Sequence, residues 1–422
     1  MTERKPMLSV AQALATLMQT ADGFYQGLDE SAIEMVPTLM ANGRVLARSQ
    51  HSTLHVPPMD NTQMDGYAVS AADCASGVAC LRVSQRIPAG VTGQILEAGT
   101  AARIFTGAFI PEGADAVVMQ EQCRTEIRVE NGVEVSYVHI DHQPEPGEWI
   151  RRQGEDITEG ACILTAGTRL RPQETGLAAS VGLASLPVWR RLKVAVFFTG
   201  DELTMPGEPL RPGSIYNSNR YLLSGLLQNL GCEVSDFGIV PDSLEATRVT
   251  LRQAAREHDV ILTSGGVSVG EEDHIRPAVT AEGQINMWQI AVKPGKPLAL
   301  GEVRREGGGS AFFLGLPGNP VSSFVTFLLF VRPFLLRMQG VAQVAPASFR
   351  VRADFELSKA DKRNEFLRAK MNQEGGLDLF PNQSSGVLTS TVWGDGLIDV
   401  APGQTIARGE MVTFIPFSSV LF

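Results

Sequence analysis

The sequence predicts a multidomain protein of the α/β plus β class. It has a central, doubly wound, mostly parallel sheet domain, an inserted β-rich domain, a mixed N-terminal domain and a small C-terminal β-barrel-like domain. Between Leu192 and about Gln339, apolar strand-like runs alternate with amphipathic helical segments, an order typical of parallel sheets. On either side, short β-like runs are punctuated by glycine and proline. The 422 residues suffice for about three domains of roughly 100–200 residues each.

The pattern of apolar residues changes twice in the first half of the chain. From Leu8 to about Arg48, apolar residues recur at helical spacing, and residues 52–150 then show β-like runs with an Asn131-Gly132 hairpin signal. Residues 151–187 are rich in turns and include a helical stretch from Pro172 to Gly182. Because helix-containing pieces flank a β piece, we predict that residues 52–150 are inserted into an elongated, discontinuous N-terminal domain of residues 1–51 and 151–187.

The second half alternates regularly. "SNRYLLSGLLQNLG" predicts a helix closing on Gly231, Ser243 is the predicted cap of the next helix, and Asn319-Pro320 opens a third. The strands expected between them are "LKVAVFFTG", "EVSDFGIV", "DVILTSGG" and "AFFLGLPG". We assign residues 188–340 to this α/β domain and residues 341–422, which return to short strands and turns, to a C-terminal β domain.

Net charge, apolar runs and cysteine content restrict the partners and the cellular location that we expect for the protein. Lys+Arg 36 against Asp+Glu 46 gives a net charge of −10, which argues against nucleic acid as a partner but permits a local basic pocket for a small anion. The apolar run Val321–Leu336 is interrupted by polar residues and predicts a buried helix, so we expect no membrane insertion. Five scattered cysteines without a C-x-x-C pair, and an N-terminus without a signal-peptide core, indicate the cytoplasm.

Three stretches follow predicted strands of the central sheet: "TGDEL", "TSGGVSVGEED" and "LPGNPVSS". Ligands of open α/β sheets bind beyond the carboxyl ends of strands, and glycines there let backbone amides approach an anion. Gly265-Gly266 followed by Ser268 therefore predicts a cradle for an anionic group. The alternative is that all three are ordinary strand-to-helix turns.

Carboxylates beside a phosphate cradle suggest Mg²⁺, which proteins bind through one or two carboxylates plus substrate phosphates. The alternative for each acid is a solvated surface residue or a helix-start residue. The candidates are Asp201, Glu202, Asp242, Glu271, Glu272 and Asp273.

Two further segments carry charge in a constrained backbone. In "VKPGKPLALG", prolines hold Lys293 and Lys296 three residues apart, which suits an oxyanion pocket, although two solvated lysines are the alternative. "MDGYAV" offers Asp65 in a turn, which is weak by itself. The pairs His51/His55 and His139/His142 have spacings that a metal could use, but no further cysteine or histidine accompanies them in sequence, so no transition-metal site is expected.

Eight segments together resemble the molybdopterin molybdenumtransferase family, the MoeA type of bacteria and the E-domain of gephyrin. They run in the family's order over residues 60 to 327: "MDGYAV", "TGAFIPEGADAVVMQE", "RRQGEDI", "TGDEL", "GSIYNSNRYLL", "TSGGVSVGEEDH", "VKPGKPLALG" and "LPGNPVSSFVTF". The chain departs from the family at His274, where tyrosine is common.

The resemblance implies an activity: insertion of molybdenum from molybdate into adenylated molybdopterin, with Mg²⁺-assisted release of AMP. It also implies a homodimer of elongated subunits, with the site in a cleft between the α/β domain of one subunit and residues of the other. The molybdopterin-adenylating enzyme and apo-molybdoenzymes are the other partners expected. The physics agrees, because two lysines with hydroxyls and amides can hold a tetrahedral dianion.

Residue roles follow from the resemblance motif by motif. The catalytic residues expected are Asp273, Asp242, Lys293 and Lys296, and the metal ligands expected are Asp273, Asp242 and Glu202. Ser264, Gly265, Gly266 and Ser268 would cradle the adenylate phosphates, and Pro297 and Ser322 would join the lysines in the molybdate pocket, with Arg368 and Ser385 from the C-terminal domain. Asp65, Thr106, Asp156 and Glu202 would line the cleft, Asp65 from the partner subunit.

Other functions on the same fold remain open at this point. A non-catalytic scaffold that binds partner peptides is one, although such a protein would have no need of the charges at Asp242, Asp273, Lys293 and Lys296. A molybdopterin-adenylating enzyme has a similar α/β core but normally lacks the flanking β domains. A tungsten-inserting paralogue is the third, since tungstate and molybdate have nearly the same size and charge.

Overall fold

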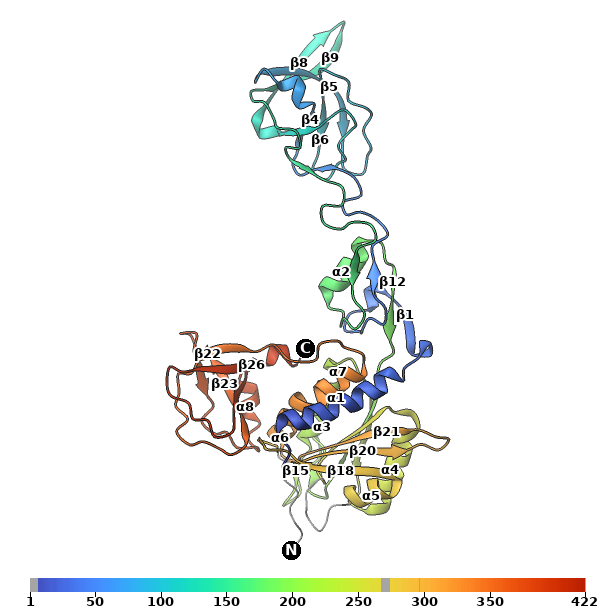
Figure 1. Ribbon diagram of the computed structural model, residues 1–422, viewed down its shortest axis with the longest axis vertical. Coiled ribbons are helices and arrows are strands. Elements are labelled where there is room, and N and C mark those ends of the chain that lie inside the picture. The colour runs from blue at the N-terminus through green and yellow to red at the C-terminus, as the bar shows by residue number, and fades with distance from the viewer. Residues whose placement is uncertain (1–6, 267–273, 296, 422) are drawn as a thin grey trace.

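The computed structural model describes residues 7–266, 274–295 and 297–421. Figure 1 shows an elongated molecule, with a β domain at one end and a slender connecting domain below it. The central α/β domain lies at the other end, with the C-terminal β domain beside it. The predicted site residues Ser268, Asp273 and Lys296, like the acids Glu271 and Glu272, lie outside the described residues.

The central sheet has the strand order β16-β13-β17-β21-β20-β18 within the described residues. The first four strands pair in parallel, whereas β20 and β18 are antiparallel additions at one edge. The predicted doubly wound, mostly parallel sheet is therefore confirmed. The strands are β13 (Lys193–Thr199), β16 (Glu233–Val240), β17 (Val260–Ser264), β18 (Gly283–Gln289), β20 (Pro297–Arg304) and β21 (Ser310–Leu316), and the short pair β14 (Leu203–Thr204) and β15 (Ile215–Tyr216) lies outside this sheet.

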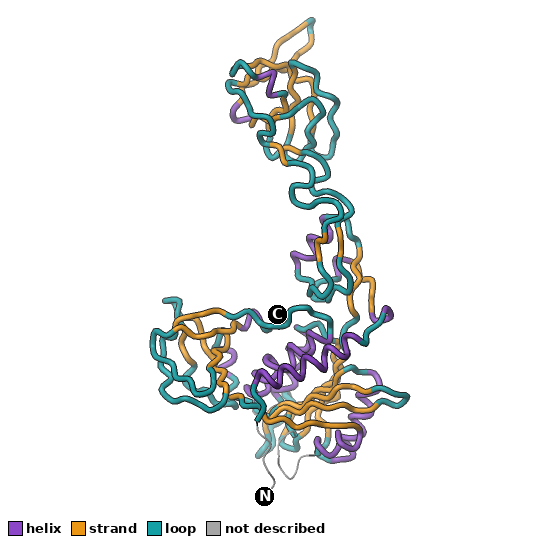
Figure 2. Tube along the Cα trace, in the orientation of Figure 1, coloured by secondary structure: helices purple, strands orange, loops and turns teal. Residues whose placement is uncertain are grey.

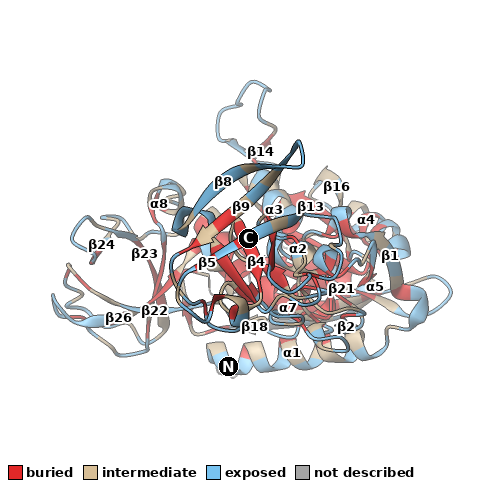
Figure 3. Ribbon diagram, turned by 90° about the horizontal axis from the view of Figure 1, so that it is seen from above, coloured by how far each residue is buried: buried red, intermediate tan, exposed pale blue. Residues whose placement is uncertain are grey.

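Helices cover both faces of this sheet, because successive strand residues point to opposite sides. In β13, Val194 and Val196 belong to one buried cluster, while Ala195 and Phe197 belong to the other. The first cluster includes residues of α1 (Val10–Gln26), α3 (Ser218–Asn229), α6 (Pro320–Thr326) and α7 (Arg332–Met338), and the second includes residues of α4 (Leu244–Glu257) and α5 (Ile275–Glu282). In Figure 3, buried residues are seen around β13 and β21 of this domain, and also in the sheets of the two β domains.

The helical segment Pro320–Met338 joins α6 and α7 through a π-helical turn, Phe327–Val331. An 18-residue stretch of this 19-residue segment has a mean hydropathy of 1.6, so by length and composition alone it could cross a membrane. However, 89% of that stretch is buried inside the protein, as expected for a core helix. This confirms the buried helix predicted from Val321–Leu336.

The N-terminal segment departs from its prediction. Helix α1 begins with a capping box at Ser9 and ends at Gln26, so the helical pattern expected up to Arg48 is wrong beyond that point. The chain then forms β1 (Ile33–Pro37), because this segment finds a backbone partner in β12 (Ser185–Trp189), more than a hundred residues away. The connecting domain also contains β2 (Gln50–His51), β11 (Cys162–Leu164) and α2 (Pro172–Ser180).

The distal β domain has the strand order β7-β4-β6-β5-β9-β8. Its predicted hairpin is confirmed: Asn131 and Gly132 have φ of 51° and 79°, the positive values that a two-residue turn requires. Figure 2 shows that loops connect this domain to the rest of the chain. Its strands are β3 (Asn61–Thr62), β4 (Gly66–Val69), β5 (Ala79–Ile87), β6 (Thr100–Ile104), β7 (Ala116–Met119), β8 (Cys123–Glu130), β9 (Val133–Ile140) and β10 (Ile150–Arg151).

The C-terminal domain is built on a sheet of order β19-β23-β25-β26-β22, with β24 paired to β23. Strand β19 comes from the central part of the chain, and it pairs in parallel with the start of β23. The two domains therefore share a sheet. The elements are β19 (Val292–Lys293), β22 (Phe349–Arg352), β23 (Asn364–Met371), β24 (Leu377–Leu379), α8 (Thr389–Trp393), β25 (Gly396–Val400) and β26 (Met411–Pro416).

Candidate functional site

The carboxyl ends of β13, β17 and β21 lie side by side, as their parallel register requires. The backbone N–H of Gly265 donates to the carbonyl of Leu316 over 3.1 Å. A Cβ on Gly265 would meet the carbonyl oxygen of Thr199 at 3.3 Å, and one on Gly318 would meet the Cα of Gly265 at 3.7 Å. The three glycine-containing turns therefore pack closely at one edge of the sheet.

Ser264 holds two of these turns together. It is 4% exposed, and its hydroxyl donates to the carbonyl of Pro317 over 2.9 Å and lies 2.9 Å from the Oγ of Ser323. The Nδ2 of Asn219 donates to the Oγ of Ser264 over 2.8 Å and to the carbonyl of Gly318 over 2.7 Å. Because the Ser264 hydroxyl is fully engaged, it positions the turns, and the partly exposed backbone at Gly265 and Gly266 borders the space beyond the strand ends.

Asn219 is a residue that the sequence analysis did not single out, although it stands inside the motif "GSIYNSNRYLL". It comes from the first turn of α3, where Asn217 is the N-cap and accepts from the backbone N–H of Arg220 over 3.1 Å. The Oδ1 of Asn219 is buried and has no hydrogen-bond partner among the described residues. A buried acceptor without a donor is unusual in a folded protein, and here it lies among the three turns.

The segment after β18 brings the oxyanion candidates to α6. Gly295 has a φ of 100°, and a Cβ there would overlap the hydroxyl of Thr326 and lie 3.2 Å from the carbonyl oxygen of Ser322. Pro297, which begins β20, is half-buried, and Ser322 is 4% exposed. The Pro294-Gly295 turn is thus fitted against the helix that follows β21.

Lys293 is paired with acids of the C-terminal domain. Its Nζ lies 2.6 Å from Oε1 of Glu365 and 3.5 Å from Oδ2 of Asp361. Glu365 is buried beside it because β19 and β23 place the two residues in register. Hydrogen bonds from Arg363, with the nearby Lys293 charge, hold the pKa of Asp361 well below its ordinary value. Asp361 is therefore a carboxylate at neutral pH.

Ser385 lies against the start of α6. Its carbonyl accepts a hydrogen bond from the backbone N–H of Val321 over 3.0 Å, which puts the loop of the C-terminal domain next to Ser322. The structure thus brings Lys293, Pro297, Ser322 and Ser385 into one region.

Arg368 holds this loop through buried hydrogen bonds. Its side chain is 1% exposed, its Nε donates to Ser390 Oγ over 3.1 Å and its Nη2 donates to the carbonyl of Ser384 over 3.2 Å. Burial lowers the pKa of Arg368 to about 10, so it remains charged at neutral pH. This geometry favours a role in fixing the Ser384-Ser385 backbone over direct contact with a ligand.

The described acidic candidates follow neighbouring strands. Asp242 comes two residues after β16 and Glu202 three residues after β13, and these strands are adjacent in the sheet. The Glu202 carboxylate folds over Gly200, where an added Cβ would lie 2.5 Å from Oε2. Carboxylate oxygens are the donors that Mg²⁺ prefers, so these two side chains fit that ion.

Asp65, Thr106 and Asp156 lie away from the central sheet. Oδ1 of Asp65 accepts from the backbone N–H and the hydroxyl of Thr106, each over 2.8 Å, and these bonds lower the pKa of Asp65. Both residues belong to the distal domain, at the opposite end of the molecule from the central sheet (Figure 1). Asp156 lines a separate hollow near Val56 and Pro57. One chain alone does not bring these three residues to the strand ends.

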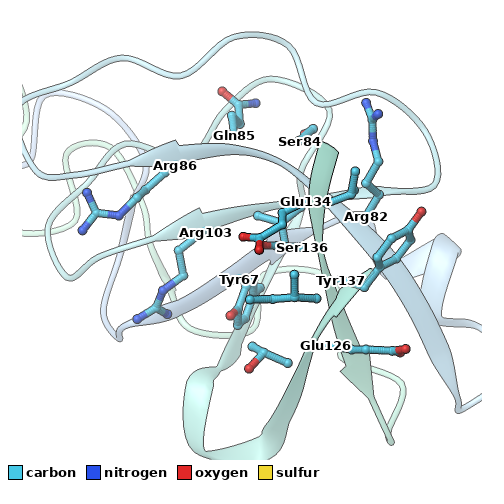
Figure 4. Close-up of a pocket in the computed structure, with 14 residues that line it drawn as sticks. Tyr67, Arg82, Ser84, Gln85, Arg86, Arg103, Glu126, Glu134, Ser136 and Tyr137 are labelled. Carbon is cyan, nitrogen blue, oxygen red and sulfur yellow. The ribbon is translucent and has the colours of Figure 1, made fainter. Parts of the chain in front are cut away.

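A hollow of about 650 Å³ lies on the distal sheet rather than at the strand ends. Figure 4 shows its labelled lining, in which Arg82 and Tyr137 lie on one side and Arg86 and Arg103 on the other. The guanidinium of Arg103 stacks on the ring of Tyr67, 5.2 Å from its centroid. None of the predicted site residues lines this hollow.

Glycine-containing turns and buried serines at the carboxyl edge of a doubly wound sheet are features typical of α/β proteins that bind anionic ligands. Comparison with known families gives three matches along the chain. They are "MoeA N-terminal region (domain I and II)" at residues 8–182, "Probable molybdopterin binding domain" at residues 195–337 and "MoeA C-terminal region (domain IV)" at residues 350–417.

Among curated proteins, a molybdopterin molybdenumtransferase of Haemophilus influenzae is 38% identical, over 90% of this chain and 93% of its own length. One from Nostoc sp. is 37% identical, over 90% of this chain and 87% of its own. A crystal structure of the molybdopterin biosynthesis MoeA protein from Pyrococcus horikoshii has a TM-score of 0.79 at 27% identity, covering 97% of this chain and 100% of that one. This chain belongs to the molybdopterin molybdenumtransferase (MoeA) family, as the resemblance predicted.

Proposed function

We propose that this protein acts in molybdenum cofactor biosynthesis as a cytoplasmic transferase. It inserts molybdenum from molybdate into adenylated molybdopterin and releases AMP with the help of Mg²⁺. Family membership supports the pathway, since the curated relatives carry the name molybdopterin molybdenumtransferase. The molybdopterin-adenylating enzyme and apo-molybdoenzymes are its proposed partners before and after the reaction.

The observation that carries the proposal is the proximity of two anion-binding elements. The Gly265 turn contacts the Leu316–Gly318 turn, and α6, which begins directly after it, contacts both Gly295 and Ser385. A phosphate at the glycine turns and an oxyanion beside Ser322 would therefore be neighbours. Such proximity is what transfer between a nucleotide-linked dithiolene and molybdate requires.

Lys293 retains capacity for the oxyanion despite its carboxylate partners. An ammonium has three N–H donors, and Glu365 and Asp361 account for two of them. The third can donate to a molybdate oxygen. The carboxylates fix the direction of the ammonium, so a tetrahedral dianion meets a positioned charge rather than a freely rotating one.

The release of AMP breaks a phosphate linkage, which depends mainly on charge neutralisation and positioning. Bound Mg²⁺ would supply that neutralisation as a Lewis acid. Asp242 and Glu202 are the described side chains that would hold it. The amide of Gly266 would orient the phosphate, since the N–H of Gly265 already donates to the carbonyl of Leu316. Asn219 and Ser264 keep this turn in place through their hydrogen bonds to the neighbouring turn.

We also propose that the working form is a homodimer, because Asp65 and Thr106 lie in the distal domain, too far away to reach the ends of the central strands of their own chain. Their hydrogen-bonded pair would instead meet the site of a second copy. Large exposed apolar side chains support contact between copies: Met35, Leu39 and Met40 are 63%, 92% and 68% exposed.

The direct experiment incubates the purified protein with molybdopterin adenylate, Mg²⁺ and molybdate, and measures AMP. We expect AMP release that requires both Mg²⁺ and the oxyanion. AMP with tungstate alone would indicate the tungsten paralogue, and no AMP with either oxyanion would support a scaffold and refute the proposal.

A mixing experiment tests the second copy. Asp65→Asn and Lys293→Met are expected to be inactive as separate dimers, but a mixed dimer contains one site in which both residues are intact. Random exchange of equal amounts should restore about a quarter of the wild-type sites. No recovery, despite subunit exchange verified by native mass spectrometry, would show that Asp65 does not act across the dimer.

A further inference from the structure

Three strands of the distal domain bring unlike metal-binding side chains onto one face of the sheet. Cys80 of β5 stands directly opposite His139 of β9 in the antiparallel register. On β8, Arg124 stands opposite His139, and Glu126 is two residues further along. Residues that face one another, and those two apart on the same strand, share a face of the sheet. Cys80, Glu126 and His139 therefore converge from three strands.

Their ligand atoms are close enough to share one ion. The Nε2 of His139 lies 2.8 Å from Oε2 of Glu126 and 3.8 Å from the Sγ of Cys80, and all three ligand atoms lie within 4.8 Å of one another. Tetrahedral Zn²⁺, with bonds of about 2.0–2.3 Å, needs ligand atoms roughly 3.3–3.7 Å apart. Side-chain shifts of about 1 Å or less would meet that requirement.

From sequence alone, no transition-metal site is expected at His139 and His142, because no third cysteine or histidine is near them in sequence. The fold changes the partners. His142 instead lies 3.9 Å from Glu148, while His139 gains Cys80, which is 59 residues away in sequence, and Glu126. The cluster is open to solvent, since Cys80 is exposed and the Glu126 side chain is 43% exposed.

A guanidinium lies at the cluster in this structure. The Nη2 of Arg128 donates to Oε2 of Glu126 over 2.8 Å and lies 3.4 Å from the Sγ of Cys80, and its guanidinium stacks on Tyr137, 4.3 Å from the ring centroid. The cluster thus attracts one positive charge already, and a divalent cation bound by thiolate and carboxylate would replace it.

We propose that Cys80, Glu126 and His139 form a surface site for a thiophilic divalent ion of the zinc class, in competition with the side chain of Arg128. Sulfur, imidazole and carboxylate donors favour Zn²⁺ and exclude Mg²⁺ as the preferred ion, because Mg²⁺ requires oxygen ligands. Water completes the fourth position. The site clamps the β8–β9 hairpin to β5, in the domain at the top of Figure 1, and it is independent of the proposed activity at the central sheet.

The test uses the full-length protein and two probes. Co²⁺ is titrated while the thiolate-to-cobalt absorption in the near ultraviolet is recorded, and Zn²⁺ affinity is measured by calorimetry. We expect one ion per chain at micromolar metal, and loss of the cobalt band in Cys80→Ser. Cys162→Ser is the matched control, because Cys162 is another exposed free thiol but lies in β11, away from this cluster.

Arg128→Ala gives a second, opposite readout. Removing the competing guanidinium should tighten zinc binding by about tenfold, the effect expected when a charge-assisted hydrogen bond no longer has to be broken. Three results would each overturn the proposal. They are weaker zinc binding in Arg128→Ala, a cobalt band that survives in Cys80→Ser, and no binding by the wild type at micromolar metal.

Discussion

The hydrogen bonds of Asn219 give the sharpest test of how the strand ends are held together. Replacing Asn219 with alanine removes donors to the Oγ of Ser264 and the carbonyl of Gly318, at 2.8 and 2.7 Å. Each lost hydrogen bond costs about 0.5–1.5 kcal/mol, and a buried acceptor left unpaired costs up to about 3 kcal/mol. Two such losses predict a destabilisation of about 2–4 kcal/mol.

The same substitution should affect activity more than stability alone explains. The Gly265 and Gly318 turns pack together through this network, so without Asn219 the backbone amides lose their fixed direction. We expect AMP release to fall about 100-fold, the scale seen when a site is misplaced by about 1 Å. Denaturant unfolding and AMP release by the same preparation are the two measurements.

Asn217→Ala is the matched control. Asn217 caps the same helix, through a hydrogen bond from the backbone N–H of Arg220, but it makes no described contact with the turns. Loss of a cap costs about 1 kcal/mol and should leave AMP release near the wild-type rate. If the two variants had equal activity, or if Asn219→Ala lost less than about 1 kcal/mol, the positioning role of Asn219 would be refuted.

Three further substitutions test other parts of the structure. Gly295→Ala should destabilise the protein by about 2–4 kcal/mol, because φ at this position is 100° and the new methyl group would overlap the hydroxyl of Thr326 in α6. A loss of less than about 0.5 kcal/mol in denaturant unfolding would contradict this packing. Glu365→Gln removes a carboxylate 2.6 Å from the Nζ of Lys293 and should tighten molybdate binding about 15-fold by calorimetry. This is the effect expected when a unit charge is removed about 5 Å from a dianion in a water-like dielectric. Weaker binding would show that the aiming of the lysine by Glu365 outweighs this charge repulsion. Side-chain hydrogen bonds from Arg352 and from Asn372 hold the pKa of Asp354 at about 2. The stabilising contribution of the Asp354 carboxylate is therefore present above about pH 4 and is lost as the pH falls towards about 2. Asp354→Asn should therefore lose less stability than the wild type across that window, and identical pH profiles of thermal unfolding would argue against the depressed pKa.

Features set by local chemistry could be predicted from the sequence. Ser243 accepts from the backbone N–H of Ala246 as the predicted cap of α4, and Asn319 precedes Pro320 at the start of α6. The Asn131-Gly132 turn forms because both residues tolerate positive φ. In each case the residues that decide the conformation lie within a few positions of one another.

Features set by distant partners could not be predicted in this way. Strand β1 forms against β12, and β18 adds antiparallel to β20 with a sequence, GQINMWQ, that has no strong strand signal. The ion pairs of Lys293 depend on the register between β19 and β23, which no local pattern reports. Convergence of the three turns was predictable only because parallel strands must end at the same edge.

The resemblance assigned Arg368 and Lys293 to one pocket, but the structure gives the two cations different surroundings. Arg368 is enclosed, with its donors directed at Ser390 and Ser384, so its charge acts through the backbone of the loop that holds Ser385. The Lys293 side chain is 39% exposed, and its two carboxylate partners among the described residues account for two of its three donors. Sequence motifs can identify both positions, yet only packing distinguishes a ligand from its support.

The domain arrangement explains why no single motif was decisive. Lys293 belongs to the central domain in sequence, but it stands on β19, a strand of the C-terminal sheet, so its position depends on how the two domains dock. Asp65 and Thr106 form a pair in a third domain, at the far end of the same chain (Figure 1). If the site needs all three, each domain carries only part of the chemistry. A site that is shared in this way requires only a short, weak motif in the sequence of each domain.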